Sequence, residues 1–210
     1  MTEHNPSSMR AAMVESQLRT SDVSDTRVIA AMARVPREAF VPAERRPMAY
    51  VDRAIPLPGG RALNPPLATG RLLSELRIEP GDHVLLIGAA TGYCATLLEA
   101  MDADVVAVEE EGGPEWMARG IQPVRGLLAA GAPQHAPYDV LLIDGAVEEV
   151  PAAIVEQLAE GARVATGLVE RGVTRLCTGR KVAGTLGLAS LTDMEMVILP
   201  GFSAPARFVF

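Results

Sequence analysis

The sequence predicts an α/β fold with a mostly parallel central sheet, and three observations indicate it. Residues 83–87 are a short apolar run without polar alternation, which is typical of a parallel strand buried on both faces. Gly88 and Gly92 bracket a tight turn, and residues 93–101 have the length and composition of a crossover helix. Residues 104–109 then form a second buried strand that ends in an acid. This strand, turn, helix and strand together are typical of half a nucleotide-binding fold.

The turn and the acid predict one ligand site. In a sheet of this kind ligands bind outside the carboxyl ends of the strands, so the turn and Glu109 point to the same place. The turn reads Gly88-Ala89-Ala90-Thr91-Gly92, which lacks the G-x-G-x-x-G spacing of a dinucleotide site. An acid after the next strand better suits a single nucleoside whose ribose hydroxyls are held by Glu109. The alternative is that the glycines only close a turn and that Glu109 begins a solvated loop.

The second half of the chain predicts the rest of the sheet. Residues 138–145 read as a buried strand ending in Asp144, and Pro151 is well placed to open a helix through Ala159. A strand over residues 161–169 follows. An antiparallel finish is predicted from residues 173–182, 186–191 and 194–199, and the phenylalanines at 202, 208 and 210 are expected to seal the core or a lid.

A helical arm is predicted ahead of the first strand. Residues 8–20 have helical spacing, and a second helix begins with Ser24 or Asp25 as its cap and ends at Pro36. The prolines between residues 36 and 58 indicate an irregular segment that lies over the site as a lid. We therefore expect a single domain over residues 1–210, with the arm and lid at 1–79 and a Rossmann-like core at 80–210.

Composition excludes several classes of function. A net charge of −7 argues against a nucleic-acid surface, because phosphate binding needs clustered positive charge. Cys94 and Cys177 are too few for a disulfide framework, and spaced His and Cys ligands for a metal are missing. The sequence has neither an apolar signal core at its start nor eighteen consecutive apolar residues, so we expect a cytoplasmic protein without membrane contact. The oligomeric state stays open.

Sequence blocks along the chain add a more specific indication. They include Gln17-Leu18-Arg19, Val35-Pro36-Arg37-Glu38 and Phe40-Val41-Pro42, followed by residues 84–93 and Ala136-Pro137-Tyr138-Asp139. In order and spacing these blocks resemble the protein-L-isoaspartate O-methyltransferase family, whose glycine turn is V-L-E-I-G-x-G-S/T-G-Y. The resemblance implies a class I methyltransferase fold with helices on both faces of the sheet. It also implies S-adenosylmethionine as methyl donor and the carboxylate of isoaspartyl residues in damaged proteins as acceptor.

Four positions depart from the family pattern, and they are the ones that would carry the chemistry. Leu86 stands where the family has an acid that helps to hold the methionine part of the cofactor, and Ala90 replaces the middle glycine. Asn64 stands at the family's serine beside the methyl-transfer site, and Leu127 replaces an acid that faces the adenine. The connection over residues 112–122 is also shorter than the family's crossover helix.

The resemblance and the residues together give a set of candidate site residues. Gly88, Ala90, Gly92 and Glu109 are expected to bind the cofactor. Asn64 is a candidate catalytic residue, because its amide can donate a hydrogen bond to an acceptor carboxylate, and Thr69 occupies a substrate-side place in the family motif. Their alternatives are a turn residue before Pro65-Pro66 and a residue in the first turn of a helix.

Asp144 ends a strand next to this site and has two possible roles. It is a candidate for holding the cofactor ammonium in place of the acid missing at Leu86, or for contacting a different acceptor. The alternative is a cap for the turn before Pro151.

Three functions therefore compete. The first is an active methyltransferase of the isoaspartyl-repair type, which family resemblance favours. The second is a methyltransferase-like scaffold or regulatory partner, because losing carboxylate contacts at Leu86 and Leu127 costs about 3–6 kcal/mol of cofactor binding. The third is a methyltransferase for another acceptor, which Asp144 favours.

Overall fold

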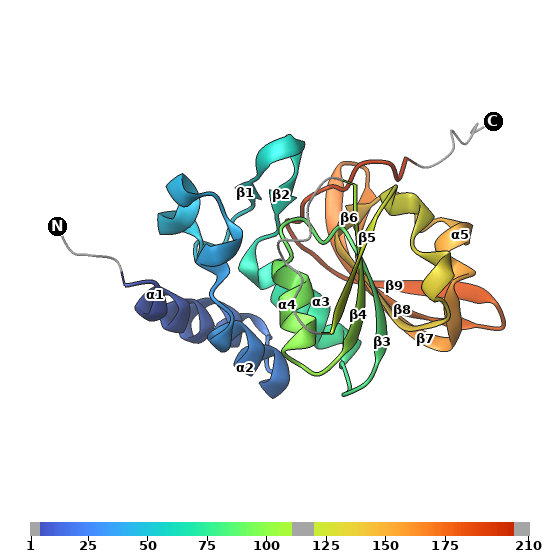
Figure 1. The fold of residues 1–210 in the computed structure, drawn as a ribbon, viewed down its shortest axis with the longest axis horizontal. Helices are drawn as coiled ribbons and strands as arrows, with labels where there is room; N and C mark the ends of the chain where they lie inside the picture. Colours follow the sequence, from blue (N-terminus) through green and yellow to red (C-terminus); the bar gives the residue numbers. More distant parts are fainter. Residues whose placement is uncertain (1–4, 111–119, 204–210) are drawn as a thin grey trace.

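The computed structural model describes residues 5–110 and 120–203, and a seven-stranded sheet lies at its centre (Figure 1). The strand order is β5-β4-β3-β6-β7-β8-β9. The first five strands of this order pair in parallel, whereas β8 and β9 pair antiparallel. The strands are β3 (His83–Ile87), β4 (Asp104–Glu109), β5 (Ile121–Arg125), β6 (Tyr138–Val147), β7 (Leu158–Glu170), β8 (Val173–Val182) and β9 (Thr185–Asp193). The predicted mostly parallel sheet with an antiparallel finish is confirmed.

The direction of strand succession reverses between β3 and β6. From β3 the chain proceeds to β4 and β5 on one side, and then returns to β6, β7, β8 and β9 on the other. The pairing of β3 with β6 ends at Ile87 and Ile143, and β6 continues beyond it to Val147. Open α/β sheets bind ligands outside the carboxyl ends of the strands at a reversal of this kind, and we call this region of the protein the crevice.

Helices cover both faces of the sheet, as the continuous apolar strands predict. Leu86 and Leu142 belong to one hydrophobic cluster, which also includes side chains of α3 (Pro66–Leu76) and α4 (Tyr93–Glu99). Neighbouring strand residues, such as Leu85, belong to a second cluster on the opposite face, which α5 (Ala152–Val155) partly covers. Figure 1 shows α3 and α4 on one side of the strands and α5 on the other.

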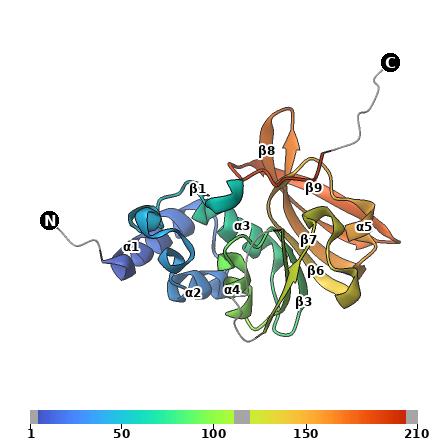
Figure 2. The ribbon, with the colours of Figure 1, turned by 45° about the horizontal axis from the view of Figure 1, so that its top comes forward.

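The amino-terminal arm is helical, as predicted, and packs on the same face as α3 and α4 (Figure 2). α1 (Pro6–Met13) continues as a π-helix over Val14–Leu18, and α2 (Thr26–Arg34) follows. Asp25 is the N-cap of α2, since its side chain accepts hydrogen bonds from the next backbone amides. The segment before α3 contains 3₁₀ turns at Arg37–Phe40, Ala43–Met48 and Pro58–Gly60 and the short strands β1 (Ile55–Pro56) and β2 (Ala62–Leu63).

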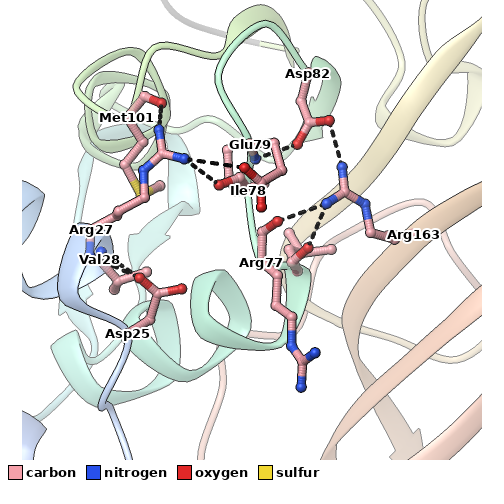
Figure 3. A network of polar contacts seen from close by, with 10 residues as sticks. Asp25, Arg27, Val28, Arg77, Ile78, Glu79, Asp82, Met101 and Arg163 are labelled. Atoms are coloured by element: carbon pink, nitrogen blue, oxygen red, sulfur yellow. Dashed lines mark hydrogen bonds and ion pairs between the residues drawn. The ribbon is translucent and has the colours of Figure 1, made fainter.

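Two arginines fasten the arm and β7 to the loop that enters β3 (Figure 3). Arg27 of α2 donates to the carbonyls of Ile78 at 2.9 Å and Met101 at 2.5 Å. Arg163 of β7 pairs with Asp82 at 2.5 Å. These contacts lie at the amino end of β3, opposite the crevice, so they hold the far end of the sheet together.

Two predictions for the carboxyl-terminal part are wrong. The helix expected from Pro151 through Ala159 is a single turn, because β7 already begins at Leu158, whose backbone pairs with Tyr138. The segment 194–199 is not a further antiparallel strand. Its bridge, between Ile198 and Ala146, is parallel, because the chain leaves β9 and crosses over β6.

Some expectations concern residues that the structure does not describe. The connection over residues 112–122 is described only from residue 120, and its last two residues belong to β5. The phenylalanines at 208 and 210 lie outside the described residues, whereas Phe202 is buried in the second cluster. In the described ranges, no helix is long and apolar enough to cross a membrane.

Candidate active site

The crevice brings together the glycine turn after β3, Glu109 at the end of β4 and Asp144 within β6, and these three strands are neighbours in the sheet. The turn has positive φ angles at alternate residues, with +80° at Gly88, +50° at Ala90 and +90° at Gly92. Both glycines are therefore placed where the backbone favours glycine. Ala90 adopts the same left-handed region at a cost of about 1 kcal/mol, which explains why a glycine suits the middle of this turn.

Glu109 is buried and holds the turn from the end of β4. Its Oε2 accepts a hydrogen bond from the amide of Ala90 at 2.6 Å, and its Oε1 accepts one from the amide of Glu110 at 3.0 Å. Both oxygens also accept from Arg61, whose Nε and Nη2 lie 3.0 and 2.9 Å away. The solvated-loop alternative is wrong for Glu109, since its side chain is 2% exposed.

Arg61 is a site residue that sequence reasoning missed. It follows Gly59-Gly60 in the irregular segment before α3, where neither periodicity nor a motif marks a side chain as functional. Only the tertiary structure brings this segment to the end of β4. The pairing is a bidentate guanidinium–carboxylate contact, the strongest geometry that these groups form.

Asn64, Thr69 and Asp144 form one buried network on the other side of the crevice. Oδ1 of Asp144 accepts hydrogen bonds from Nδ2 of Asn64 at 2.9 Å and from the hydroxyl of Thr69 at 3.3 Å. The amide oxygen of Asn64 accepts from the backbone amide of Val197 at 2.8 Å. Both polar ends of the Asn64 side chain are thus engaged, and the residues we assigned separately to catalysis and to cofactor binding are direct neighbours.

A fully buried arginine, Arg37, contacts this network through the backbone of Asn64. Arg37 donates from Nε to the carbonyl of Ala49 at 2.8 Å and from Nη2 to the carbonyl of Asn64. Its guanidinium stacks over the ring of Tyr93, 4.7 Å from the centroid. Burial lowers the pKa of Arg37, an effect that Tyr93 and Asp144 oppose. Sequence reasoning placed Arg37 in a family block, and nothing in its neighbours indicated that it is buried.

We expect the free energy of unfolding to depend on pH through Asp144. Burial raises the pKa of this carboxyl above its ordinary value, although the hydrogen bond from Asn64 and the charge of Arg37 oppose the shift. The native state therefore holds this proton more tightly than the unfolded chain. The stabilisation is complete below the ordinary pKa and is lost as pH rises through the raised pKa.

Asp144→Asn removes the titrating group and tests this expectation. The stability of the wild type minus that of the variant should fall as the pH rises above about 4, and then level off. Urea denaturation of both proteins between about pH 3.5 and 8 measures the difference. A difference that stays constant over this range would contradict the raised pKa.

Part of the crevice fits a nucleoside, and part of it does not. The glycine turn allows a close approach, and Glu109 offers carboxylate oxygens for ribose hydroxyls. Leu86, however, is completely buried in the core, and Leu127 is 70% exposed. The space beside the turn is also taken, since a Cβ placed on Gly88 would lie 2.8 Å from Leu199. A nucleoside that reached both Gly88 and Glu109 would have to displace Leu199 and Arg61.

His83 and His135 have structural contacts rather than catalytic ones. The ring of His83 stacks on Tyr138 at 4.8 Å, and its nitrogens contact Asp104 and the carbonyl of His135. Among the residues that the structure describes, no group of three or more His, Cys, Asp or Glu is arranged to hold a metal ion.

The family model described as protein-L-isoaspartate(D-aspartate) O-methyltransferase matches residues 8–199 of the chain. A protein-L-isoaspartate O-methyltransferase of Koribacter versatilis is 37% identical over 209 residues, which cover 94% of each chain. A relative of the same description in Aeropyrum pernix is 40% identical over 168 residues, which cover 74% of this chain and 65% of that protein. These matches include both the arm and the core.

Solved structures have the same fold. A structure described as protein-L-isoaspartate O-methyltransferase superposes with a TM-score of 0.77 at 23% identity, covering 91% of this chain and 66% of that one. A beta-aspartate methyltransferase from Plasmodium falciparum, in complex with S-adenosyl-L-homocysteine, superposes with a TM-score of 0.72 at 18% identity. This superposition covers 94% of this chain and 99% of the Plasmodium falciparum chain.

Proposed function

This chain belongs to the protein-L-isoaspartate(D-aspartate) O-methyltransferase family, and on that basis we propose that it transfers a methyl group from S-adenosylmethionine to the carboxylate of isoaspartyl residues in damaged proteins. The observation that carries the proposal is the match over residues 8–199, which includes the arm as well as the sheet. A match to the sheet alone would support only a nucleotide-binding fold.

The reaction asks little of the protein's side chains beyond placement. When bound, S-adenosylmethionine supplies a methyl group on a sulfonium, and a carboxylate attacks it without prior deprotonation. The protein therefore contributes alignment and the exclusion of water. Glu109 is suited to accept hydrogen bonds from ribose hydroxyls, and the turn from Gly88 to Gly92 is suited to lie against the donor.

The acceptor side is proposed to lie at Asn64 and Thr69. In the structure both side chains donate to the carboxylate of Asp144, which uses the one hydroxyl proton of Thr69 and one of the two N–H groups of Asn64. The second N–H of Asn64 is the donor proposed for the isoaspartyl carboxylate, and Thr69 is proposed to line the acceptor side. Asp144 itself is proposed to position these two donors. A second proposal is that Asp144 holds the ammonium group of the cofactor. Measuring the affinity of Asp144→Asn for the cofactor tests this role, and an unchanged affinity would exclude it.

One observation favours a second candidate, a methyltransferase-like scaffold or regulatory partner that takes up no donor. Arg61 already pairs with Glu109, and Leu86 offers no charge to the donor. The two candidates differ in a single measurable property, which is binding of the donor by the folded protein.

Two measurements on the full chain test the proposal. The first is calorimetric titration with S-adenosylmethionine and S-adenosylhomocysteine. The second is methyl incorporation into an isoaspartyl peptide, compared with an aspartyl peptide of the same sequence. We expect incorporation into the isoaspartyl peptide alone. Micromolar donor binding without incorporation would overturn the acceptor, and a folded protein without donor binding would favour the scaffold.

A variant pair assigns the role of Glu109. We expect Glu109→Gln to weaken S-adenosylhomocysteine binding about 10- to 100-fold, because a charge-assisted hydrogen bond contributes about 1.5–3 kcal/mol. The comparison is made in an Arg61→Gln background, so that the loss of the Arg61 contact does not enter it. Glu44→Gln, at an exposed position, is the matched control. Equal affinities of Glu109→Gln and Glu44→Gln for S-adenosylhomocysteine, both in the Arg61→Gln background, would exclude Glu109 from the donor site.

A further inference from the structure

We propose that this protein carries an internal plug in its donor site, formed by Val197–Leu199 together with Arg61, and that the plug must leave before S-adenosylmethionine binds. The inference rests on the proposed function, because it takes the crevice between β3 and β6 as the donor site. It adds a conformational step that couples the carboxyl-terminal segment to donor uptake.

Residues 197–199 lie against the carboxyl-terminal part of β6. The segment that follows β9, red in Figure 1, passes over the upper ends of the central strands. Ile198 forms a parallel bridge with Ala146, whose amide donates to the carbonyl of Val197 at 2.7 Å and whose carbonyl accepts from the amide of Leu199 at 2.9 Å. The segment thus lies on the end of β6 that borders the switch point, where a ligand is expected.

Leu199 lies close to two glycines of the crevice, Gly88 and Gly145. A Cβ on Gly88 would lie 2.8 Å from Cδ1 of Leu199, and a Cβ on Gly145 would lie 2.8 Å from its Cγ and 2.7 Å from the carbonyl oxygen of Val197. Glycines at the end of such strands permit close approach of a ligand to the backbone. Here Leu199 occupies the space beside these glycines that a ligand would need, and only 4% of Leu199 is exposed.

The carboxylate of Glu109 is already paired with a side chain of the protein. Arg61 binds its carboxylate in a bidentate manner, and the two side chains are only 10% and 2% exposed. Nη2 of Arg61 also lies 3.5 Å from the position of a Cβ on Gly88, so Arg61 and Leu199 meet over the same glycine. A ligand that uses Glu109 must therefore displace Arg61, and one that reaches Gly88 must displace both.

Within the part of the chain that the structure describes, the segment Val197–Leu199 of the plug is joined to its surroundings by few backbone hydrogen bonds. Its backbone is held by the two hydrogen bonds to Ala146 and by the bond from Val197 to the side chain of Asn64, at 2.8 Å. By contrast, β7 and β8 pair through eight successive residues. Release of the plug also frees the amide oxygen of Asn64, which links donor uptake to the proposed acceptor side.

A plug of this kind lowers the apparent affinity for the donor. If only a fraction of molecules is open, the apparent Kd equals the intrinsic Kd divided by that fraction. Weakening the plug therefore raises the open fraction and tightens binding, even though a side chain has been removed from the site. A side chain that helped to bind the donor would have the opposite effect.

The experiment is calorimetric titration of the full chain with S-adenosylhomocysteine. We compare the wild type with Arg61→Gln, Leu199→Ala and the double variant, each first shown to be folded by circular dichroism. The matched controls are Arg45→Gln and Leu191→Ala, which change exposed residues of the same types. We expect each plug variant to bind about tenfold more tightly than the wild type, and the controls to bind as the wild type does. If Leu199→Ala does not fold, Arg61→Gln decides the question.

Hydrogen exchange supplies a second readout that is independent of activity. Adding the ligand to the wild type should speed exchange of the amides of Val197 and Leu199, because their hydrogen bonds break when the plug leaves. Tight binding to the wild type that the variants do not improve, with exchange unchanged, overturns the plug and leaves the proposed function standing. If the double variant binds the ligand more tightly than the wild type but does not methylate the isoaspartyl peptide, the plug is supported and the proposed acceptor is overturned. Absence of binding to every folded variant up to millimolar ligand overturns both.

Discussion

Replacing Arg37 by methionine should lower the free energy of unfolding by about 3–5 kcal/mol, because it leaves the buried carbonyls of Ala49 and Asn64 without their donor and removes the charge that favours the ionised form of Asp144. Asp144 and Arg37 are both buried, and they are joined through Asn64, which binds one by its side chain and the other by its carbonyl. The methionine keeps most of the apolar volume over Tyr93 but removes every donor. Urea denaturation at pH 7 measures the loss.

Two further variants separate the charge from the packing. Arg45→Met makes the same substitution at an exposed position and should change stability by less than about 0.5 kcal/mol. Asp144→Asn in the Arg37→Met background should recover part of the loss, since the uncompensated charge is then absent, with a coupling of about 1–3 kcal/mol. If the effects of Arg37→Met and Asp144→Asn on the free energy of unfolding simply add, the charge of Arg37 does not stabilise Asp144.

Gly88→Ala is the second change with a large expected effect, a loss of about 2–4 kcal/mol of stability. Two costs add at this position. The φ angle of +80° strains any residue with a Cβ, and the new Cβ lies 2.8 Å from Leu199. The loss should appear as a lower midpoint in urea denaturation with an unchanged slope.

Gly81→Ala is the matched control for the backbone cost. Gly81 has a φ angle of +82°, and nothing lies within 4 Å of a Cβ placed there, so this variant should lose only about 1–2 kcal/mol. Leu199→Ala in the Gly88→Ala background should cost less than Leu199→Ala alone, because it relieves the contact. Equal losses for the two glycine variants would mean that Leu199 does not press on the turn.

The candidate site was predictable only in part. Gly88, Gly92 and Glu109 stand in a local order of strand, turn, helix and strand, so both their proximity and their conformations follow from the chain itself. Asn64 and Thr69 were indicated by resemblance alone. Their common partner Asp144 lies in a distant part of the sequence, and the hydrogen bonds between them depend on α3 packing against β6.

The two wrong predictions have related causes. Residues 152–159 have a helical apolar pattern, but the pairing of Leu158 with Tyr138 draws them into the sheet after one turn. Residues 194–199 have the composition of a strand, yet the chain crosses from β9 to β6 instead of adding to the antiparallel edge. A short apolar run indicates that a segment is buried, but it does not indicate which strand or helix the segment packs against.

The sequence by itself determined the fold class, the family and the glycine turn, because each depends on local patterns of apolar residues, glycines and caps that the chain carries wherever it packs. Only the tertiary structure decided what occupies the crevice. Arg61 and Leu199 come from segments before and after the core, and they meet at Gly88 because the strand order opens the sheet at that point. Charge pairing and burial between such distant segments are properties of the folded chain, and they leave no periodicity in the sequence.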